Sequence, residues 1–566
     1  MPTAGSITVQ ETLDLLDGAF ASVKKGVAEG SYSFWLGSGI SRGRVIGLDG
    51  VIAKLIEFLR SNITADANCR FRTALDSIVK MAGLTPEQRA EIDISAPAAN
   101  WACLQAMVST LWDKYSEVLS LDIPGEDLDF LLWVGLDFPN TFSGQKADAE
   151  HLALAMLALE GAVSEIATAN WDGLIEAALE ELGHSSNFLQ ITVDGEDLRG
   201  PQAAARLYKF HGCARRAIED EQTYRKMLIA RDPQIVDWMT NQTFAIVREQ
   251  LVALIQRSRT LMIGLSAQDA NIKHLFGRVG AIKGWDWNST PTPIVFAADE
   301  LSQGQKTVLN VAYGDNYGPN RDAIAQAALF RAYGKQILLS LLLSVIVEKL
   351  KTMALDAAAP NLTDGHRQAV ADGLVHLRNK VATSSEVDRL AAAQMIAATI
   401  GRAKFQLQNG ESEPGKRPYF PLDKQPVHLM AGDVASAVTG QREAANALGL
   451  IGLDDRDGIW HASVDDPTQP NSGALRLTSA TATTRIFFTA NDDNITSLLE
   501  CGAFDESDPD VVVVCSRRVS ARQQRNPSAN FRTGVVGPRY IAFGPLLQRA
   551  DGIDALREEF RSEIAI

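Results

Sequence analysis

The sequence predicts an α/β protein in which helices cover an open, mostly parallel sheet. Short apolar segments recur along the chain, and each ends in small or polar residues before a helical pattern, which is the strand–turn–helix order of a parallel sheet. The chain has 566 residues, of which 46% are hydrophobic and 22% charged, so it can form several packed domains. Its longest apolar run, residues 337–347, is shorter than the ~20 residues of a membrane span, and we expect a buried helix there.

The first strand–turn–helix unit lies near the amino end. Residues 10–29 carry apolar side chains at helical spacing, and residues 31–39 form an apolar strand that runs into a Gly-Ser-Gly turn. Residues 48–62 then have the pattern of an amphipathic helix. Units of this kind open many nucleotide-binding sheets, so we expect the turn to face a ligand.

Later segments continue the sheet. We expect strands at residues 162–168, at 205–213, at the start of 259–279 and at 292–301. Residues 65–160 are mainly helical and form an insert. Its tryptophans are expected to be packing residues; they are Trp101, Trp112 and Trp133.

The chain divides into three parts. Residues 1–355 hold the sheet and its insert, 356–415 form a helical connector, and 416–566 form an α/β or α+β domain for regulation or partner binding. Four prolines among mixed charges at 409–427 indicate a linker or domain edge. The last part has strand candidates and a terminal helix, at residues 483–492, 508–520, 538–548 and 552–564.

Charge and cysteine usage exclude some functions. The net charge of −15 argues against direct nucleic-acid binding over a broad surface, although a cluster of arginines leaves a local basic groove possible; these are Arg517, Arg518, Arg522 and Arg525. The five cysteines form no CxxC pair, which argues against a zinc ribbon and is typical of a reducing cytoplasm. The amino end lacks a signal-peptide pattern, so we expect a cytoplasmic protein without a membrane segment.

Polar residues follow the predicted strands, at the edge of an α/β sheet where ligands bind. They are Gly37, Ser38, Gly39, Ile40, Ser41 and Arg42; Asn170 and Asp172; His211 and Gly212; and Gly264, Ser266, Asp269 and Asn271. Glycines let backbone N–H groups approach a pyrophosphate, and the serines and Arg42 can bind phosphate oxygens. Asn170 can orient a water or a ribose hydroxyl, Asp172 can hold a carboxamide, and His211 can act as a general base.

Each of these features also has a structural interpretation. A Gly-x-Gly turn can bind nothing, and Asn-x-Asp after a strand is a common helix cap. His211 can be a structural histidine, Arg42 can pair with a surface acid, and Ser266 or Asp269 can cap a helix that begins near residue 270. Their occurrence together at strand ends favours a ligand site. The other seven histidines show no metal-ligand spacing, so we expect no metal.

This order of motifs resembles the sirtuin (SIR2) family. "GSGIS" at 37–41 is similar to the family's GAGIS loop, "TANWDGL" at 168–174 to TQNxDxL, and "KFHG" at 209–212 to the catalytic histidine signature. "GLSAQDANI" at 264–272 resembles the G-x-S turn of SIR2-like proteins from bacterial defence systems. The resemblance covers roughly residues 15–350.

The resemblance implies a sirtuin-like Rossmann-type sheet that takes NAD⁺ as substrate. Asn170, Asp172 and His211 would be catalytic. The residues that would bind the dinucleotide are Gly37, Ser38, Gly39, Ile40, Ser41, Arg42, Thr168, Gly264, Ser266 and Asp269. The paired CxxC motifs of sirtuin deacylases are absent, so no zinc is expected, and no Pro-Asp-Phe-Arg stretch follows the first loop. Both differences argue against binding of an acyl-lysine peptide.

The resulting hypothesis is an NAD⁺ glycohydrolase that produces nicotinamide and ADP-ribose. The resemblance is to bacterial antiphage effectors, which implies NAD⁺ depletion triggered by a partner or signal. It also implies a homo-oligomer or a separately encoded ATPase, Argonaute-like or nucleotide-processing partner that senses infection. Two alternatives remain open: an NAD-dependent protein deacylase, and a non-catalytic nucleotide-sensing subunit of a larger complex.

Overall fold

The computed structural model describes residues 2–66, 68–199, 203–411, 418–433, 435–520 and 537–566. A parallel seven-stranded sheet, in the order β3-β4-β2-β1-β5-β6-β7, lies at the centre of the molecule. Its strands are β1 (Tyr32–Leu36), β2 (Glu165–Thr168), β3 (Leu189–Thr192), β4 (Ala205–Lys209), β5 (Arg259–Ile263), β6 (Ile294–Ala297) and β7 (Leu329–Phe330). The predicted α/β class with a parallel sheet is confirmed.

Some predicted boundaries differ from the structure. Strand β4 ends at Lys209, so His211 lies in the turn beyond it. The edge strands β3 and β7, of 4 and 2 residues, are too short to show a strand pattern in the sequence. The single helix expected at 10–29 is two helices, α1 (Val9–Asp17) and α2 (Ala21–Ala28), because the first ends at Gly18.

Helices cover both faces of the sheet because alternate strand residues point to opposite sides. Phe34 and Leu36 belong to one buried cluster and Trp35 to another. The first face packs against α1, α2, α9 (Ala149–Leu159), α10 (Leu174–Glu181) and α18 (Gly334–Leu355). The second packs against α14 (Ala245–Arg257), α15 (Ala270–Lys283), α16 (Gln303–Tyr313) and α17 (Tyr317–Ala328).

Helix α18 contains the apolar run at 337–347 and is buried there, as predicted. Within the described ranges, no helix combines the length and apolar character needed to cross a membrane.

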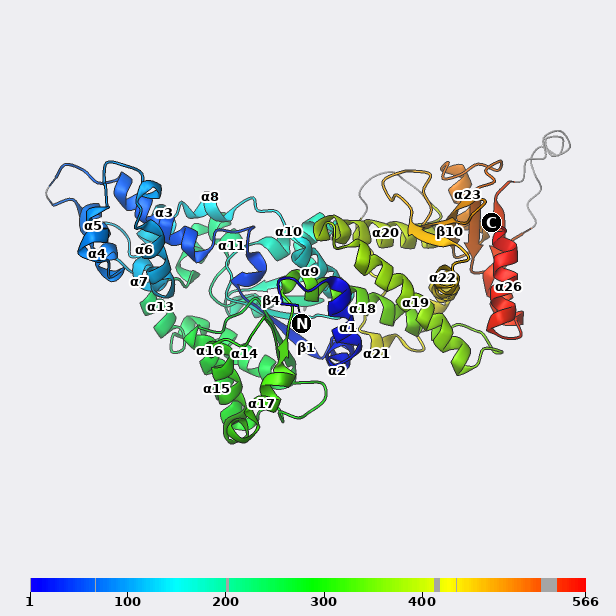
Figure 1. The fold of residues 1–566 in the computed structure, drawn as a ribbon, viewed down its shortest axis with the longest axis horizontal. Coiled ribbons are helices and arrows are strands. Elements are labelled where there is room, and N and C mark those ends of the chain that lie inside the picture. Colours follow the sequence, from blue (N-terminus) through cyan, green and yellow to red (C-terminus); the bar gives the residue numbers. More distant parts are fainter. Residues whose placement is uncertain (1, 67, 200–202, 412–417, 434, 521–536) are drawn as a thin grey trace.

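A helical insert with its own core lies at one end of the molecule (Figure 1). It consists of α3 (Leu48–Ser61), α4 (Arg70–Met81), α5 (Pro86–Ala90), α6 (Leu104–Leu111), α7 (Tyr115–Leu119), a π-turn (Leu131–Gly135) and α8 (Phe138–Phe142). Trp101 and Trp133 are buried in this core, whereas Trp112 is 39% exposed. The prediction that these tryptophans are packing residues therefore agrees with Trp101 and Trp133, whereas Trp112 lies at the surface. Helix α9, which the sequence placed in the insert, packs on the sheet instead.

The opposite end of the molecule holds the carboxyl-terminal domain (Figure 1). Its mixed sheet has the order β12-β11-β10-β9-β8, with strands β8 (His461–Val464), β9 (Leu475–Thr478), β10 (Thr483–Thr489), β11 (Val511–Cys515) and β12 (Arg539–Ala542). Its helices are α22 (Gln441–Arg456), α23 (Asp492–Glu500), α25 (Phe543–Arg549) and α26 (Ile553–Ile564). The strand expected at 538–548 is the short β12 followed by α25.

The connector joins the sheet domain to the carboxyl-terminal domain through α19 (Asp364–Ser384) and α20 (Arg389–Asn409), followed by a segment that returns to the central sheet. In this segment, residues 418–427, the N–H of Tyr419 donates to the carbonyl of Leu182 at 2.9 Å, and Tyr419 is 1% exposed. Short helix α21 (Val427–Met430) follows. Residues 412–417 of the expected linker, and Arg522 and Arg525, lie outside the described residues.

Candidate functional site

The glycine loop after β1 packs backbone-to-backbone on the loop after β5. The N–H groups of Gly37 and Gly39 donate to the carbonyls of Ile263 and Gly264, both at 3.0 Å. A Cβ on Gly37 would lie 2.4 Å from the Gly264 oxygen, and one on Gly39 would lie 2.6 Å from the Gly264 Cα. Gly264 itself has φ +65°, which favours glycine. These glycines therefore allow the two loops to meet, a structural role in addition to the predicted approach to phosphate.

The rest of the glycine loop offers an open backbone. Ser38, Gly39 and Arg42 are exposed, while Ile40 is buried beneath them. A short 3₁₀ turn, Ser38–Ser41, follows the glycines, and α3 begins at Leu48, where the sequence predicted a helix over 48–62. An anion here would therefore meet the exposed loop itself rather than the N-terminus of a long helix.

Ser41, Asn170 and Asp172 form one hydrogen-bonded group. The Ser41 hydroxyl donates to Asp172 Oδ2 at 2.8 Å, and Asn170 Nδ2 donates to Ser41 Oγ at 3.3 Å. The other Asp172 oxygen accepts from the N–H of Leu174, at the start of α10, at 3.3 Å. Thr168 Oγ1 donates to the Leu36 carbonyl and accepts from the Asn170 N–H, both at 3.0 Å. It therefore connects the ends of β1 and β2. Asp172 therefore accepts from the first residue of α10 and also orients Ser41.

His211 lies in the turn after β4 and is 5% exposed. Its Nε2 is 3.3 Å from Asp269 Oδ2 and 3.5 Å from Asn271 Nδ2. Its ring lies edge-on to Phe210 and to Trp238. Burial lowers the pKa of His211, and the Asp269 charge offsets this only in part. The imidazole is therefore neutral near pH 7, the form a general base needs.

The loop after β5 is held in place by the beginning of α16. Ser302 Oγ donates to the Ser266 carbonyl and Gln305 Nε2 to the Leu265 carbonyl, each at 2.7 Å. Ser266 is exposed at the surface of this loop. Asp269 caps α15 by accepting from the N–H of Asn271 at 2.8 Å, so it both begins a helix and faces His211.

The structure thus joins the predicted residues into two polar groups at neighbouring strand ends, linked by the glycine contacts. One group is Ser41, Asn170 and Asp172, and the other contains His211 and Asp269. Sequence reasoning noted Asn271 but gave it no role. It missed Trp238, whose indole N–H donates to the Phe210 carbonyl at 3.0 Å and which has no local sequence signal.

The sequence analysis also missed Lys209 and Glu176, a buried pair beside Asp172. The signal was present in the chain: a lysine ends an apolar strand, and a glutamate lies within the apolar run of the following helix pattern. Charged residues are rarely buried unless they are paired, so each position predicts a buried partner without identifying it.

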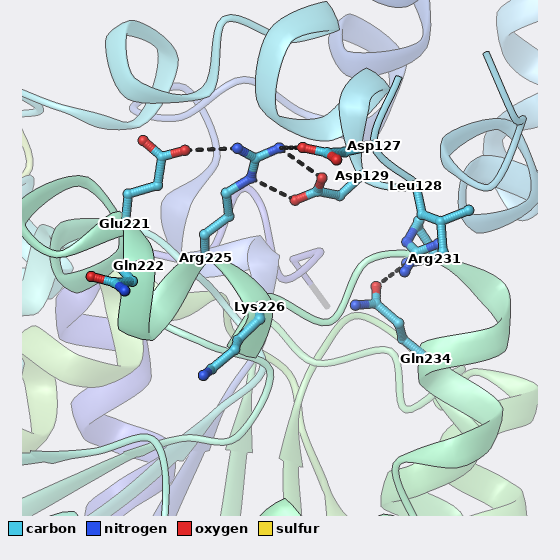
Figure 2. A pocket seen from close by; sticks show the side chains of 9 residues that line it. All are labelled: Asp127, Leu128, Asp129, Glu221, Gln222, Arg225, Lys226, Arg231 and Gln234. Carbon is cyan, nitrogen blue, oxygen red and sulfur yellow. Dashed lines mark hydrogen bonds and ion pairs between the residues drawn. The ribbon is translucent and has the colours of Figure 1, made fainter. Parts of the chain in front are cut away.

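A hollow of about 860 Å³ separates the insert from the chain that follows His211 (Figure 2). At its centre Arg225 donates to Asp129 and Glu221, each at 2.7 Å, and lies over the Trp133 ring. The hollow lies beside α12 (Glu221–Tyr224) and α13 (Asp232–Asp237). Its lining residues are Asp127, Leu128, Asp129, Glu221, Gln222, Arg225, Lys226, Arg231 and Gln234.

The segment beside this hollow, residues 227–230, joins the two cores. Met227 and Ile229 pack in the sheet core, and Leu228 and Ala230 pack in the insert core. The N–H of Ile229 donates to the His211 carbonyl at 2.9 Å. The position of the insert is therefore coupled to the backbone of the histidine.

Within the described ranges, no group of three or more His, Cys, Asp and Glu residues could hold a metal ion. The cysteines are free, and all except Cys501 are buried.

Comparison with known families gives one match. A family model of the SIR2-like domain matches residues 164–313, from the start of β2 to the end of α16. The matched part includes Asn170, Asp172, His211 and Asp269, and it begins after the glycine loop. No curated protein matches the sequence. The match supports a relation to SIR2-like proteins and an NAD-related function in general.

Proposed function

We propose that this protein is an NAD⁺ glycohydrolase that releases nicotinamide and ADP-ribose. The observation that carries the proposal is a buried, neutral His211 at one strand end and a hydrogen-bonded Asn170 at the next, within the part that matches a SIR2-like domain. The described strand ends therefore combine a base and an oriented amide, which a purely structural turn does not need.

Cleavage of the bond between nicotinamide and ribose requires little proton transfer from the protein. Nicotinamide leaves without a negative charge, and the ribose passes through an oxocarbenium-like state as in glycoside cleavage. His211 and Asn170 would orient the attacking water or a ribose hydroxyl. Asp172 would contact the nicotinamide amide through lone pairs that Ser41 and Leu174 leave free.

The dinucleotide would bind along the exposed backbone after β1 and β5. Ser38, Arg42 and Ser266 are exposed there and can donate to phosphate oxygens, whereas the N–H of the exposed Gly39 already donates to the Gly264 carbonyl. Ser41 and Thr168 are already bonded within the protein, so they would shape the site rather than hold phosphate.

We further propose that the enzyme is a regulated effector of antiphage defence in the bacterial cytoplasm. Unregulated hydrolysis of NAD⁺ would kill the host cell, so the enzyme would stay inactive until a signal or a partner binds the protein. The carboxyl-terminal domain or a homo-oligomer would supply this control, together with a separately encoded sensor such as an ATPase, an Argonaute-like protein or a nucleotide-processing protein.

The test is NAD⁺ consumption resolved by chromatography, with and without the proteins encoded beside this one. We expect nicotinamide and ADP-ribose from the wild type, and a fall in kcat of about 10²–10⁴-fold in His211→Ala and in Asn170→Ala. NAD⁺ binding without turnover under all conditions would contradict the hydrolase and support a nucleotide-sensing subunit. Formation of O-acetyl-ADP-ribose from an acetyl-peptide would instead support the deacylase.

A further inference from the structure

A buried ion pair lies directly behind the Ser41–Asn170–Asp172 group. Lys209, the last residue of β4, and Glu176, in α10, have side chains 1% and 4% exposed, and Lys209 Nζ lies 2.6 Å from Glu176 Oε1. Lys209 Nζ also donates to the main-chain carbonyl of Asp172. One ammonium group thus connects the end of β4 with the turn after β2.

This connection spans the two halves of the proposed site. Lys209 pairs with Thr168 in the sheet, two residues before Asn170, and it precedes His211 by two residues on its own strand end. The bond from Lys209 to the Asp172 carbonyl therefore fixes the position of the Asn170 turn relative to the His211 turn.

Hydrogen-bond chemistry carries this constraint to the Asn170 amide. An ionised carboxylate such as Asp172 only accepts, so the one hydroxyl proton of Ser41 is donated to it. Ser41 can then only accept from Asn170, which requires the amide to present Nδ2 to the serine. Its Oδ1 is left to accept a hydrogen bond from a ligand hydroxyl or a water.

The pair is poorly explained by stability alone. Burial lowers the pKa of Lys209, but neighbouring Cys213, Glu176 and Asp172 more than offset this, so the ammonium stays charged. Glu176 Oε2 is buried and makes no hydrogen bond within the described part of the chain. Apolar residues commonly replace buried ion pairs without loss of stability, so the contact with Asp172 is the feature that needs the charge.

We propose that Lys209, held by Glu176, is a positioning residue for NAD⁺ hydrolysis that fixes Asp172 and, through Ser41, the orientation of the Asn170 amide. The catalytic consequence rests on the proposed function. The ordering of residues 170–174 by Lys209 is independent of the proposed function, and it can be measured without NAD⁺ turnover.

The experiment compares Lys209→Met with Lys349→Met in the full-length chain. Lys349 forms the matched control pair with Glu160, both 0% exposed, at the amino end of β2. We expect Lys209→Met to lower kcat about 100-fold while KM changes by less than about threefold, because a misplaced amide affects the reacting geometry most. Lys349→Met should leave kcat within about twofold of the wild type even where it lowers Tm.

Amide hydrogen exchange supplies the readout that is independent of activity. Exchange over residues 168–176, which include the Leu174 N–H bonded to Asp172, should become at least about tenfold faster in Lys209→Met and stay unchanged in Lys349→Met. A wild type that hydrolyses no NAD⁺ either alone or with the proteins encoded beside it would refute the proposed function, while this exchange result would still decide the positioning role. Unchanged exchange in Lys209→Met would overturn the inference.

A double variant separates positioning from folding. Lys209→Met/Glu176→Leu removes both buried charges, so its Tm should recover relative to Lys209→Met while kcat and exchange do not. In an Asn170→Ala background, Lys209→Met should lower the residual kcat no further, because both changes act on the same amide. Recovery of kcat together with Tm would show that Lys209 acts only through stability, and would contradict the proposal.

Discussion

The two ends of the central sheet each contain a buried Lys–Glu pair, but the two pairs differ in what surrounds them. At the amino end, Glu160 is bonded by Lys349 at 2.8 Å, by the Leu422 N–H at 2.9 Å and by the Tyr419 hydroxyl, so both carboxylate oxygens have partners. At the carboxyl end, Glu176 leaves one oxygen unpartnered within the described residues, and Lys209 bonds a carbonyl of the candidate site.

The difference teaches that burial and charge alone do not indicate a function. The network of Glu160, in which every carboxylate oxygen has a partner, holds the returning segment 418–427 on the sheet and therefore stabilises the fold. An incompletely bonded pair at the strand ends, next to a buried histidine, has the location and the perturbed surroundings typical of a functional site.

The largest expected effect tests the amino end. Glu160→Leu leaves Lys349 as an uncompensated buried charge, so the free energy of unfolding should fall by about 3–5 kcal/mol. Denaturant unfolding measures this loss, and NAD⁺ turnover of the remaining folded protein should keep its wild-type KM. A raised KM would show that the amino end also shapes the site and would remove the contrast between the two pairs.

A glycine at each end sharpens the comparison. In Gly39→Ala the new Cβ would lie 2.6 Å from the Gly264 Cα, so the two loops must separate and the KM for NAD⁺ should rise about tenfold or more. In Gly161→Ala the Cβ would lie 2.2 Å from the Lys424 carbonyl oxygen, at φ +70°. This control should lower the free energy of unfolding by about 1–3 kcal/mol without changing KM. Calorimetric titration with NAD⁺ checks binding in both variants.

The smallest effect concerns pH. The pKa of His211 is lowered from the ordinary histidine value of 6.5, so the base stays unprotonated when the pH falls below 6.5. The value of kcat/KM should therefore decline only at more acidic pH. Asp269→Asn removes the negative charge that raises this pKa, and the acid limb should move to still lower pH. Asn caps helices as well as Asp, so α15 should persist. The other side chains that face the ring, Asn271, Phe210 and Trp238, are neutral. A limb at or above pH 6.5 would exclude His211 as the titrating base.

Much of the fold could be predicted from the sequence because strand and helix patterns are local. β1 and β5 and the positions of Asn170, His211 and Asp269 at strand ends follow from apolar segments that end in polar residues. The two-residue strand β7 could not be predicted, because it is too short to show a period. The break between α1 and α2 at Gly18 was missed because the helical spacing of apolar residues runs through both helices.

The candidate site was predictable in its members but not in its contacts. Gly-x-Gly was assigned to phosphate, whereas the approach of Gly264 to Gly39 depends on two strands that meet only in the folded sheet. Lys209 and Glu176 lie 33 residues apart in the sequence, and nothing local shows that they are buried together or that Lys209 reaches Asp172. Such contacts are properties of the tertiary structure.

The returning segment 418–427 has a consequence for how the protein is made. Tyr419 belongs to the core of a sheet whose strands all end by residue 330, so that core is finished by residues synthesised much later. A nascent chain that has not yet emerged from the ribosome past residue 427 lacks the groups of residues 419–423 that bond Glu160 and Lys349. The sheet domain is therefore completed only after residue 427 has been translated, when most of the carboxyl-terminal domain is still to be made. A prematurely terminated fragment carries the strand ends on an incomplete scaffold.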